Sequence, residues 1–170
     1  MAHIISVRGF TPKWGEECFI AENATLVGEL SMGDHCSVWF NAIVRADVNE
    51  ITVGHHSNIQ DGAVIHCTYE RAATHIGNHV TIGHRAIVHG CTLEDKVMVG
   101  MGAIVMDHAV VESGAMIAAG AVVLENTIVE ANSIYAGVPA KKVKTVGPEN
   151  KAMMERIAQN YIKYSQWYKK

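Results

Sequence analysis

The sequence predicts an all-β solenoid, a parallel β-helix of about six triangular coils, closed by one C-terminal α-helix. Two observations predict this fold. An aliphatic residue recurs at every sixth position from Ile20 to Val129, and turn-forming Gly, Asp, Asn, Glu or His residues follow these anchors. An amphipathic helix would repeat every 3.6 residues and an ordinary strand every second residue, so neither fits. A hexad that supplies one short strand and one corner does fit, with three hexads in each coil.

The anchors of the repeat remain in phase over most of the chain, with three slips. They are Ile20, Leu26, Met32, Val38, Val44, Val53, Ile59, Ile65, Ile76, Ile82, Val88, Leu93, Val99, Val105, Val111, Ile117, Val123 and Val129. The period slips after Val44, after Ile65 and after Val88. We expect the extra residues at the first two slips to bulge out as loops, the second of them near "TYERA".

The repeat ends at "YAGVPAKKVK" (135–144), and we expect a helix to begin at Pro148, because proline suits the first turn. One face of this helix is apolar or aromatic and is expected to pack along the coils. Its residues are Met153, Ile157, Tyr161, Tyr164 and Tyr168. The chain is therefore divided into a β-helix domain, 1–146, and a C-terminal helix, 147–170.

Composition limits the class of protein. At 170 residues the chain has the length of one domain. Charged residues make up only 18%, which predicts that part of the surface is hidden in an oligomer. A formal charge of −3 without a basic cluster argues against a nucleic-acid partner. Because there is no apolar run long enough for a signal peptide or a membrane span, we expect a soluble cytoplasmic protein with no membrane partner. The four cysteines form no CxxC pair and are expected to be reduced thiols.

Three histidines are candidate metal ligands because of where the hexads place them. With the loops outside the count, Arg45, His66 and His89 each follow anchors that lie three hexads apart, so they should form one column at one corner. Asp61 and His84 should be stacked at a different corner. Adjacent strands lie about 4.7–4.9 Å apart, so His66 and His89 can share one metal.

The third histidine cannot join the other two within one chain. A zinc ion holds imidazole nitrogen at about 2.0–2.1 Å, whereas two corners of a coil are roughly 15 Å apart. His84 can reach His66 and His89 only if one corner packs against another chain, and such a head-to-tail contact closes into a ring of three. Cys67 is a possible fourth ligand or a bystander. The remaining histidines are interpreted as solvated turn residues: His35, His55, His56, His75, His79 and His108.

At this point the motifs resemble a known family. "VRAD" (44–47), "NIQDGAVIH" (58–66) and "GHRAIVHG" (83–90), set on hexapeptide repeats, resemble the γ-class carbonic anhydrases. The likeness extends from "CFIAENATLVGEL" to the closing helix. It implies a left-handed β-helix homotrimer that binds zinc, or iron or cobalt, between its subunits. It also implies reversible hydration of carbon dioxide to bicarbonate by a metal-bound hydroxide.

The resemblance also implies roles for individual residues. By this resemblance, His66 and His89 are metal ligands from one chain, and His84 is the ligand from its neighbour. Arg45 and Asp47 correspond to an intersubunit pair, and Gln60 and Asp61 to the residues that orient the metal-bound water. Asn58 begins that motif, and Tyr161 corresponds to a tyrosine that reaches the cavity. By residue type alone, Arg45 and Asp47 could equally be a structural ion pair or an anchor for an anionic substrate.

The sequence departs from the family pattern where a proton shuttle is expected. Val48 and Tyr69 occupy positions that are acidic in well-characterised members, although Glu70 is adjacent. Two alternative functions stay open. "YAGVPAKKVK" also resembles the closing motif of hexapeptide acyltransferases, so acyl-CoA thioesterase or acyltransferase chemistry is one alternative. A non-catalytic, metal-stabilised trimeric scaffold is the other.

Overall fold

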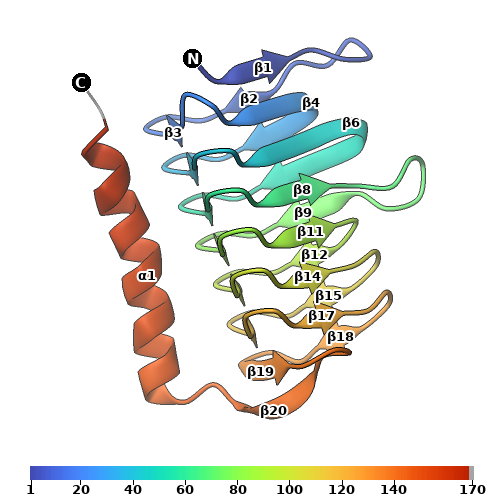
Figure 1. Ribbon diagram of the computed structural model, residues 1–170, viewed down its shortest axis with the longest axis vertical. Helices are drawn as coiled ribbons and strands as arrows, with labels where there is room; N and C mark the ends of the chain where they lie inside the picture. Colours follow the sequence, from blue (N-terminus) through green and yellow to red (C-terminus); the bar gives the residue numbers. More distant parts are fainter. Residues whose placement is uncertain (169–170) are drawn as a thin grey trace.

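The computed structural model describes residues 1–168 and is a left-handed parallel β-helix of about seven turns with one C-terminal helix. Figure 1 shows the coils stacked along the long axis, with the helix along one side. The first face of the prism contains β1 (His3–Ile5), β4 (Thr25–Met32), β6 (Ile43–Val53), β8 (Val64–His66), β11 (Ile87–His89), β14 (Ile104–Val105) and β17 (Val122–Val123). The second contains β2 (Lys13–Trp14), the far halves of β4 and β6, β9 (Thr74–Ile76), β12 (Thr92–Leu93), β15 (Val110–Val111) and β18 (Ile128–Val129).

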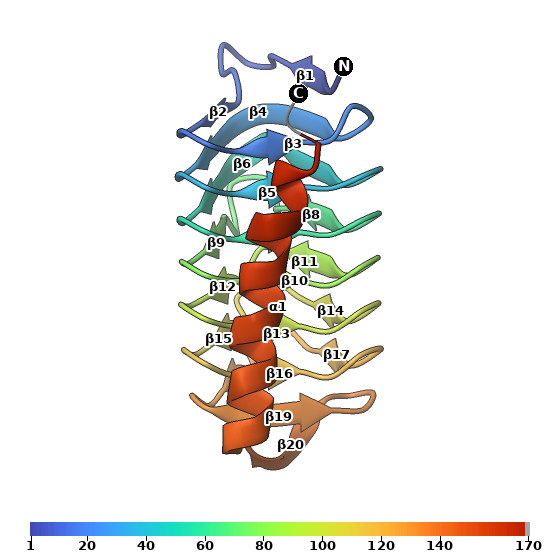
Figure 2. The same ribbon diagram turned by 90° about the vertical axis from the view of Figure 1, so that its left-hand side faces the viewer.

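The third face is a separate sheet and carries the helix. It contains β3 (Phe19–Ile20), β5 (Ser37–Val38), β7 (Asn58–Ile59), β10 (Thr81–Ile82), β13 (Met98–Val99), β16 (Met116–Ile117) and β19 (Ser133–Ala136), and β20 (Lys141–Thr145) pairs antiparallel with β19. Helix α1 (Pro148–Gln166) runs across these strands, as Figure 2 shows. It begins at the proline from which the sequence predicts a helix.

The hexad anchors fill the interior. Val44, Ile65 and Val88 are fully buried, and alanines such as Ala63 and Ala86 fill the corners beside them. Each buried aliphatic side chain stabilises the fold by roughly 1.5–3 kcal/mol relative to its exposed state. Because each anchor lies above its equivalent in the next coil, the core sets the register that positions the turns.

One expectation about the coils needs correction, and one is confirmed. The structure has about seven turns rather than six, because β1 and β2 pair with β4 ahead of the first anchor at Ile20. The residues inserted after Val44 do bulge out: Gly28 pairs with Ala46 and Leu30 with Ile51, so β6 has three more residues than β4 at this corner. They remain part of an extended strand that continues to Val53 instead of a separate loop. Gly28 permits the close approach there, since a Cβ atom would lie 2.1 Å from the Ala46 carbonyl oxygen.

The second expected loop is present. Thr68 and Ala72 form an isolated antiparallel bridge, and the segment between them projects from the prism after β8 (Figure 1). Within the described residues, no helix is both long and apolar enough to cross a membrane.

Candidate metal centre

The centre of the site is a histidine pair on neighbouring coils. His66 and His89 end β8 and β11, and they lie opposite each other in the parallel pairing of these strands. His66 Nδ1 is 3.1 Å from His89 Nε2. Two nitrogens bound tetrahedrally to one zinc at about 2.0–2.1 Å would be about 3.3 Å apart. The register predicted by counting hexads is confirmed, and the pair has the spacing of two ligands of one metal.

Asp47 and Arg45 hold the His66 side of the pair. His66 Nε2 lies 3.1 Å from Asp47 Oδ1, and Arg45 Nη1 donates to Asp47 Oδ2 at 2.6 Å. Burial raises the pKa of Asp47, but the hydrogen bonds from Arg45 and His66 outweigh it and leave that pKa below its usual 3.8. Burial, followed by the charges of Arg45 and His89, lowers the pKa of His66 below 6.5, against the opposing effect of Asp47. His66 is therefore kept in the neutral form that a metal requires.

Asp107 holds the His89 side, and the sequence reasoning missed it. His89 Nδ1 lies 2.6 Å from Asp107 Oδ1, and the Thr68 hydroxyl donates to the other carboxylate oxygen at 2.5 Å. Burial raises the pKa of Asp107, but the hydrogen bonds from Thr68 and His89 outweigh it and bring that pKa below its usual 3.8. A carboxylate behind a ligating histidine fixes the ring and raises its basicity.

A signal for Asp107 was present in the repeat. Val88 pairs with Val105, so residue 107 lies one coil away from Gly90, directly beside the histidine column. A Cβ atom at Gly90 would lie 2.4 Å from Asp107 Oδ1, so the glycine makes room for the carboxylate.

His84 lies at a different corner, in the turn that precedes the His89 turn of the same coil. Its Nδ1 is 3.0 Å from Asp61 Oδ2, and its Nε2 is 3.1 Å from the Tyr161 hydroxyl of α1. Burial, then the charge of Asp61 and the neighbouring Tyr164, raises the pKa of Tyr161 to about 12. The structure thus places Tyr161 against the histidine that the resemblance assigns to the neighbouring subunit's site.

Asn58 and Gln60 belong to one buried network under α1. Gln60 Nε2 donates to Asn58 Oδ1 at 3.1 Å, and Asn58 Nδ2 donates to the Thr81 hydroxyl at 2.9 Å. Gln60 and His84 both line a hollow of about 400 Å³ beside α1. The network holds the Gln60 amide at the edge of this hollow.

The structure therefore brings the predicted residues together in two groups. Arg45, Asp47, His66 and His89 lie at one corner, and Asn58, Gln60, Asp61, His84 and Tyr161 lie around another. Within residues 1–168 no three His, Cys, Asp or Glu side chains converge into a metal site. Cys67 is buried, and its thiol donates to the Asn49 carbonyl at 3.2 Å, which directs it away from the histidine pair.

The two positions where the family pattern has an acidic proton shuttle, Val48 and Tyr69, carry no carboxylate in this chain. Val48 packs against the core. Tyr69 is 54% exposed on the projecting loop, with the Arg8 guanidinium 5.5 Å from its ring centre. A hydrogen bond with Glu70 raises the pKa of Tyr69. Glu70 is therefore the nearest acidic side chain in sequence to the histidine that ends β8.

The chain is similar to several known proteins over almost its whole length. No family model matches the chain. A Geobacillus kaustophilus protein named carbonic anhydrase is 40% identical over 98% of this chain and 91% of its own length. Gamma carbonic anhydrase 2, mitochondrial, of Arabidopsis thaliana is 37% identical over 96% of this chain, which spans 60% of that plant protein. A solved hexapeptide transferase family protein from Anaplasma phagocytophilum is 40% identical, with a TM-score of 0.94 over 98% of both chains.

Proposed function

Because this chain belongs to the γ-class carbonic anhydrase family, we propose that it catalyses the reversible hydration of carbon dioxide to bicarbonate at a metal held between subunits of a homotrimer. The single observation that carries the proposal is the His66–His89 pair, whose facing nitrogens are 3.1 Å apart. His84 of a neighbouring subunit supplies the third ligand in this arrangement. Zinc fits three imidazoles, and iron or cobalt is accepted by the same donors.

The bound metal would supply a hydroxide at neutral pH, because it lowers the pKa of water from about 15.7 to near 7. The chain's own residues do the rest. Asp47 and Asp107 accept hydrogen bonds from His66 and His89 and hold both rings in place. Asp61 lies beside His84, with its Oδ2 atom 3.0 Å from His84 Nδ1.

Gln60, Asp61 and Arg45 surround the place where the substrate would react. The Gln60 amide and the Asp61 carboxylate come with His84 from one subunit, and they orient the water and the carbon dioxide. Arg45, paired with Asp47, lies on the other subunit and offers a cation to the bicarbonate that leaves. The released proton leaves through the projecting loop, where Glu70 is the carboxylate available, or directly to buffer.

The test is stopped-flow hydration of carbon dioxide by zinc-loaded and anaerobically iron-loaded protein, with His84→Ala and His89→Ala as separate variants. Each variant should be inactive. Trimers assembled from an equal mixture of the two variants should regain about one quarter of the activity. An intact site needs a His84→Ala chain to supply the histidine pair and a His89→Ala neighbour to supply His84. Each of these two places is filled correctly with a probability of one half, which gives one quarter. A site contained in one chain would regain none.

The fold likeness to a hexapeptide transferase family protein favours acyl-CoA chemistry as the second candidate. If fully metallated trimer hydrates no carbon dioxide but hydrolyses an acyl-CoA thioester, and that hydrolysis depends on His84, the second candidate replaces the first. If neither reaction occurs and chelation dissolves the trimer, the metal is a scaffold.

A further inference from the structure

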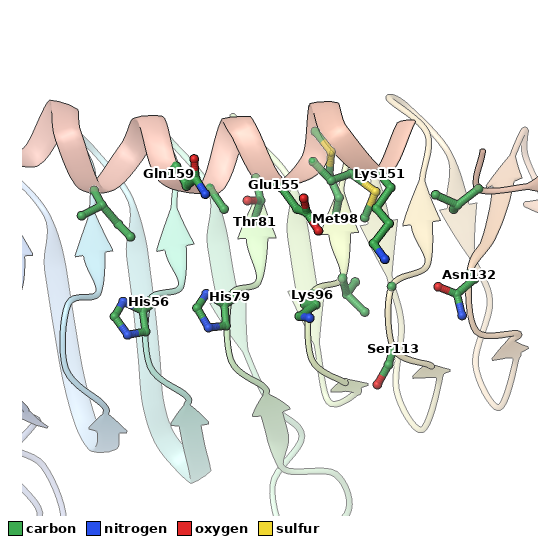
Figure 3. A pocket seen from close by; sticks show the side chains of 16 residues that line it. His56, His79, Thr81, Lys96, Met98, Ser113, Asn132, Lys151, Glu155 and Gln159 are labelled. Atoms are coloured by element: carbon green, nitrogen blue, oxygen red, sulfur yellow. The ribbon is translucent and has the colours of Figure 1, made fainter. Parts of the chain in front are cut away.

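A second hollow lies between helix α1 and one column of turns, and neither His66 nor His89 lines it. It has a volume of about 590 Å³, within the roughly 300–1,000 Å³ of ligand sites. Figure 3 shows His56, His79 and Lys96 in a row along the turns, and Lys151, Glu155 and Gln159 facing them from the helix. We call this hollow the helix groove.

The turn wall of the helix groove is a regular ladder of basic side chains. His56, His79 and Lys96 occupy equivalent turn positions in successive coils and share a left-handed backbone, with φ of 57°, 56° and 59°. Their side chains therefore leave the turns in the same direction. The His56 and His79 rings stack with centres 4.8 Å apart and planes within 6°. These histidines are therefore more than separate solvated turn residues, which is how the sequence was interpreted.

The lining of the helix groove carries more positive than negative charge. Among the described residues, neither Lys96 nor Lys151 forms an ion pair or a side-chain hydrogen bond, and Glu155 is the one carboxylate in the lining. Lys151 also lies in the first turn of α1, where the positive end of the helix dipole disfavours a cation. With neutral histidines the lining carries a net charge of +1, from two lysines and one glutamate, although the whole chain carries −3. A bound monoanion would balance this charge.

The floor of the helix groove is apolar. It is formed by Val97, Met98, Met154, Ala158 and Ile162, and Val97 is 1% exposed. Methionine side chains adapt to ligands of different shape. A ligand that uses both the floor and the lysines must have an apolar body and one charged end.

We propose that the helix groove binds an organic carboxylate with an apolar body, whose carboxylate lies between Lys96 and Lys151. The site is separate from the proposed metal centre. Its turn column is the third corner of the prism, distinct from the corners of His66 and of His84. The groove therefore stays open when those two corners meet between subunits.

The test is isothermal titration calorimetry of the zinc-loaded, full-length protein with octanoate as the probe. Octanol has the same body without the charge, and butyrate has the same charge with a shorter body. We expect both to bind at least tenfold more weakly than octanoate. Added salt should weaken octanoate binding and leave octanol unchanged, because salt screens only the charged contact.

Two sets of variants place the site. Lys96→Gln and Lys151→Gln should each raise the octanoate Kd about fivefold, and the double variant about twentyfold. Lys163→Gln is the matched control, since Lys163 is exposed on the same helix outside the groove. All variants should keep the wild-type melting temperature and carbon dioxide hydration rate. The proposal is overturned if octanol matches octanoate, if octanoate does not bind, or if the double variant matches the control.

Discussion

Replacing Asp107 with asparagine should weaken metal binding about tenfold without unfolding the protein. The structure gives the reason. Asp107 accepts a hydrogen bond from His89 Nδ1 at 2.6 Å and another from the Thr68 hydroxyl. An asparagine oxygen can still accept from His89, and its amide can donate to Thr68, so the shape survives. What is lost is the charge, and a charge-assisted hydrogen bond is roughly twice as strong as a neutral one.

Alanine at the same position should have a larger effect of a different kind. It leaves His89 Nδ1–H and the Thr68 hydroxyl without their acceptor; the cost is roughly 1–3 kcal/mol for a fully buried group and less for these two, which are only partly buried. We expect zinc affinity to fall about a hundredfold and the melting temperature to fall with it. The asparagine variant therefore separates the electrostatic role of Asp107 from its structural role.

The assay is competition for zinc with a chromophoric chelator, supported by the visible absorption band of the cobalt-loaded protein. Asp95→Asn is the matched control, because Asp95 accepts a hydrogen bond from the Asn78 backbone at 2.7 Å in a different column of turns. A zinc Kd for Asp107→Asn within twofold of wild type would refute the reasoning. So would an equal loss of affinity in the control.

Three further predictions follow from the same contacts. Tyr161→Phe should tighten zinc binding about threefold to tenfold, because it removes the hydrogen bond on His84 Nε2 that a metal must displace; weaker binding in the chelator competition would contradict this. Burial lowers the pKa of His66 and of His56 below 6.5, so the unfolded chain binds more protons below that pH. The free energy of unfolding of the metal-free protein should thus be fully retained above pH 6.5 and fall as the pH falls further, and urea titrations that give a flat or opposite trend would count against it. Turnover at saturating carbon dioxide should rise about tenfold with imidazole buffer, and Glu70→Gln should strengthen that dependence, since a buffer replaces a weak internal shuttle; turnover independent of buffer would show that an efficient shuttle exists.

The sequence predicted the fold so well because a hexad repeat couples sequence spacing directly to position in space. Once Val44, Ile65 and Val88 are assigned to one face, the residues that follow them must form a column. The separation of His84 from His66 follows from the same count. The N-terminal coil was missed because Ile4 and Trp14, which pair with the anchors Leu26 and Met32, are ten residues apart, and because Trp14, although six residues before Ile20, is not aliphatic.

The contacts of the site were harder to predict than its register. The Asp107–His89 hydrogen bond joins turns of neighbouring coils, and it depends on how the turn after Val105 directs its side chain. Tyr161 meets His84 only because α1 folds back along the third face, and no spacing in the sequence sets that angle. Contacts between residues far apart in the sequence are set by side-chain packing wherever the hexad repeat does not fix them.

The position of His84 along the coil has a consequence for how copies assemble. One coil rises about 4.8 Å, so each corner lies about 1.6 Å above the one before it. The His84 turn is therefore about 3.2 Å above the His66 turn and about 1.6 Å below the His89 turn. This is within about 1 Å of the level midway between the two paired histidines. In the proposed trimer a neighbour would deliver its His84 to the pair by rotation alone, with almost no sliding along the axis. An axial shift at every contact would build an open filament, whereas its near absence would let the set of subunits close on itself.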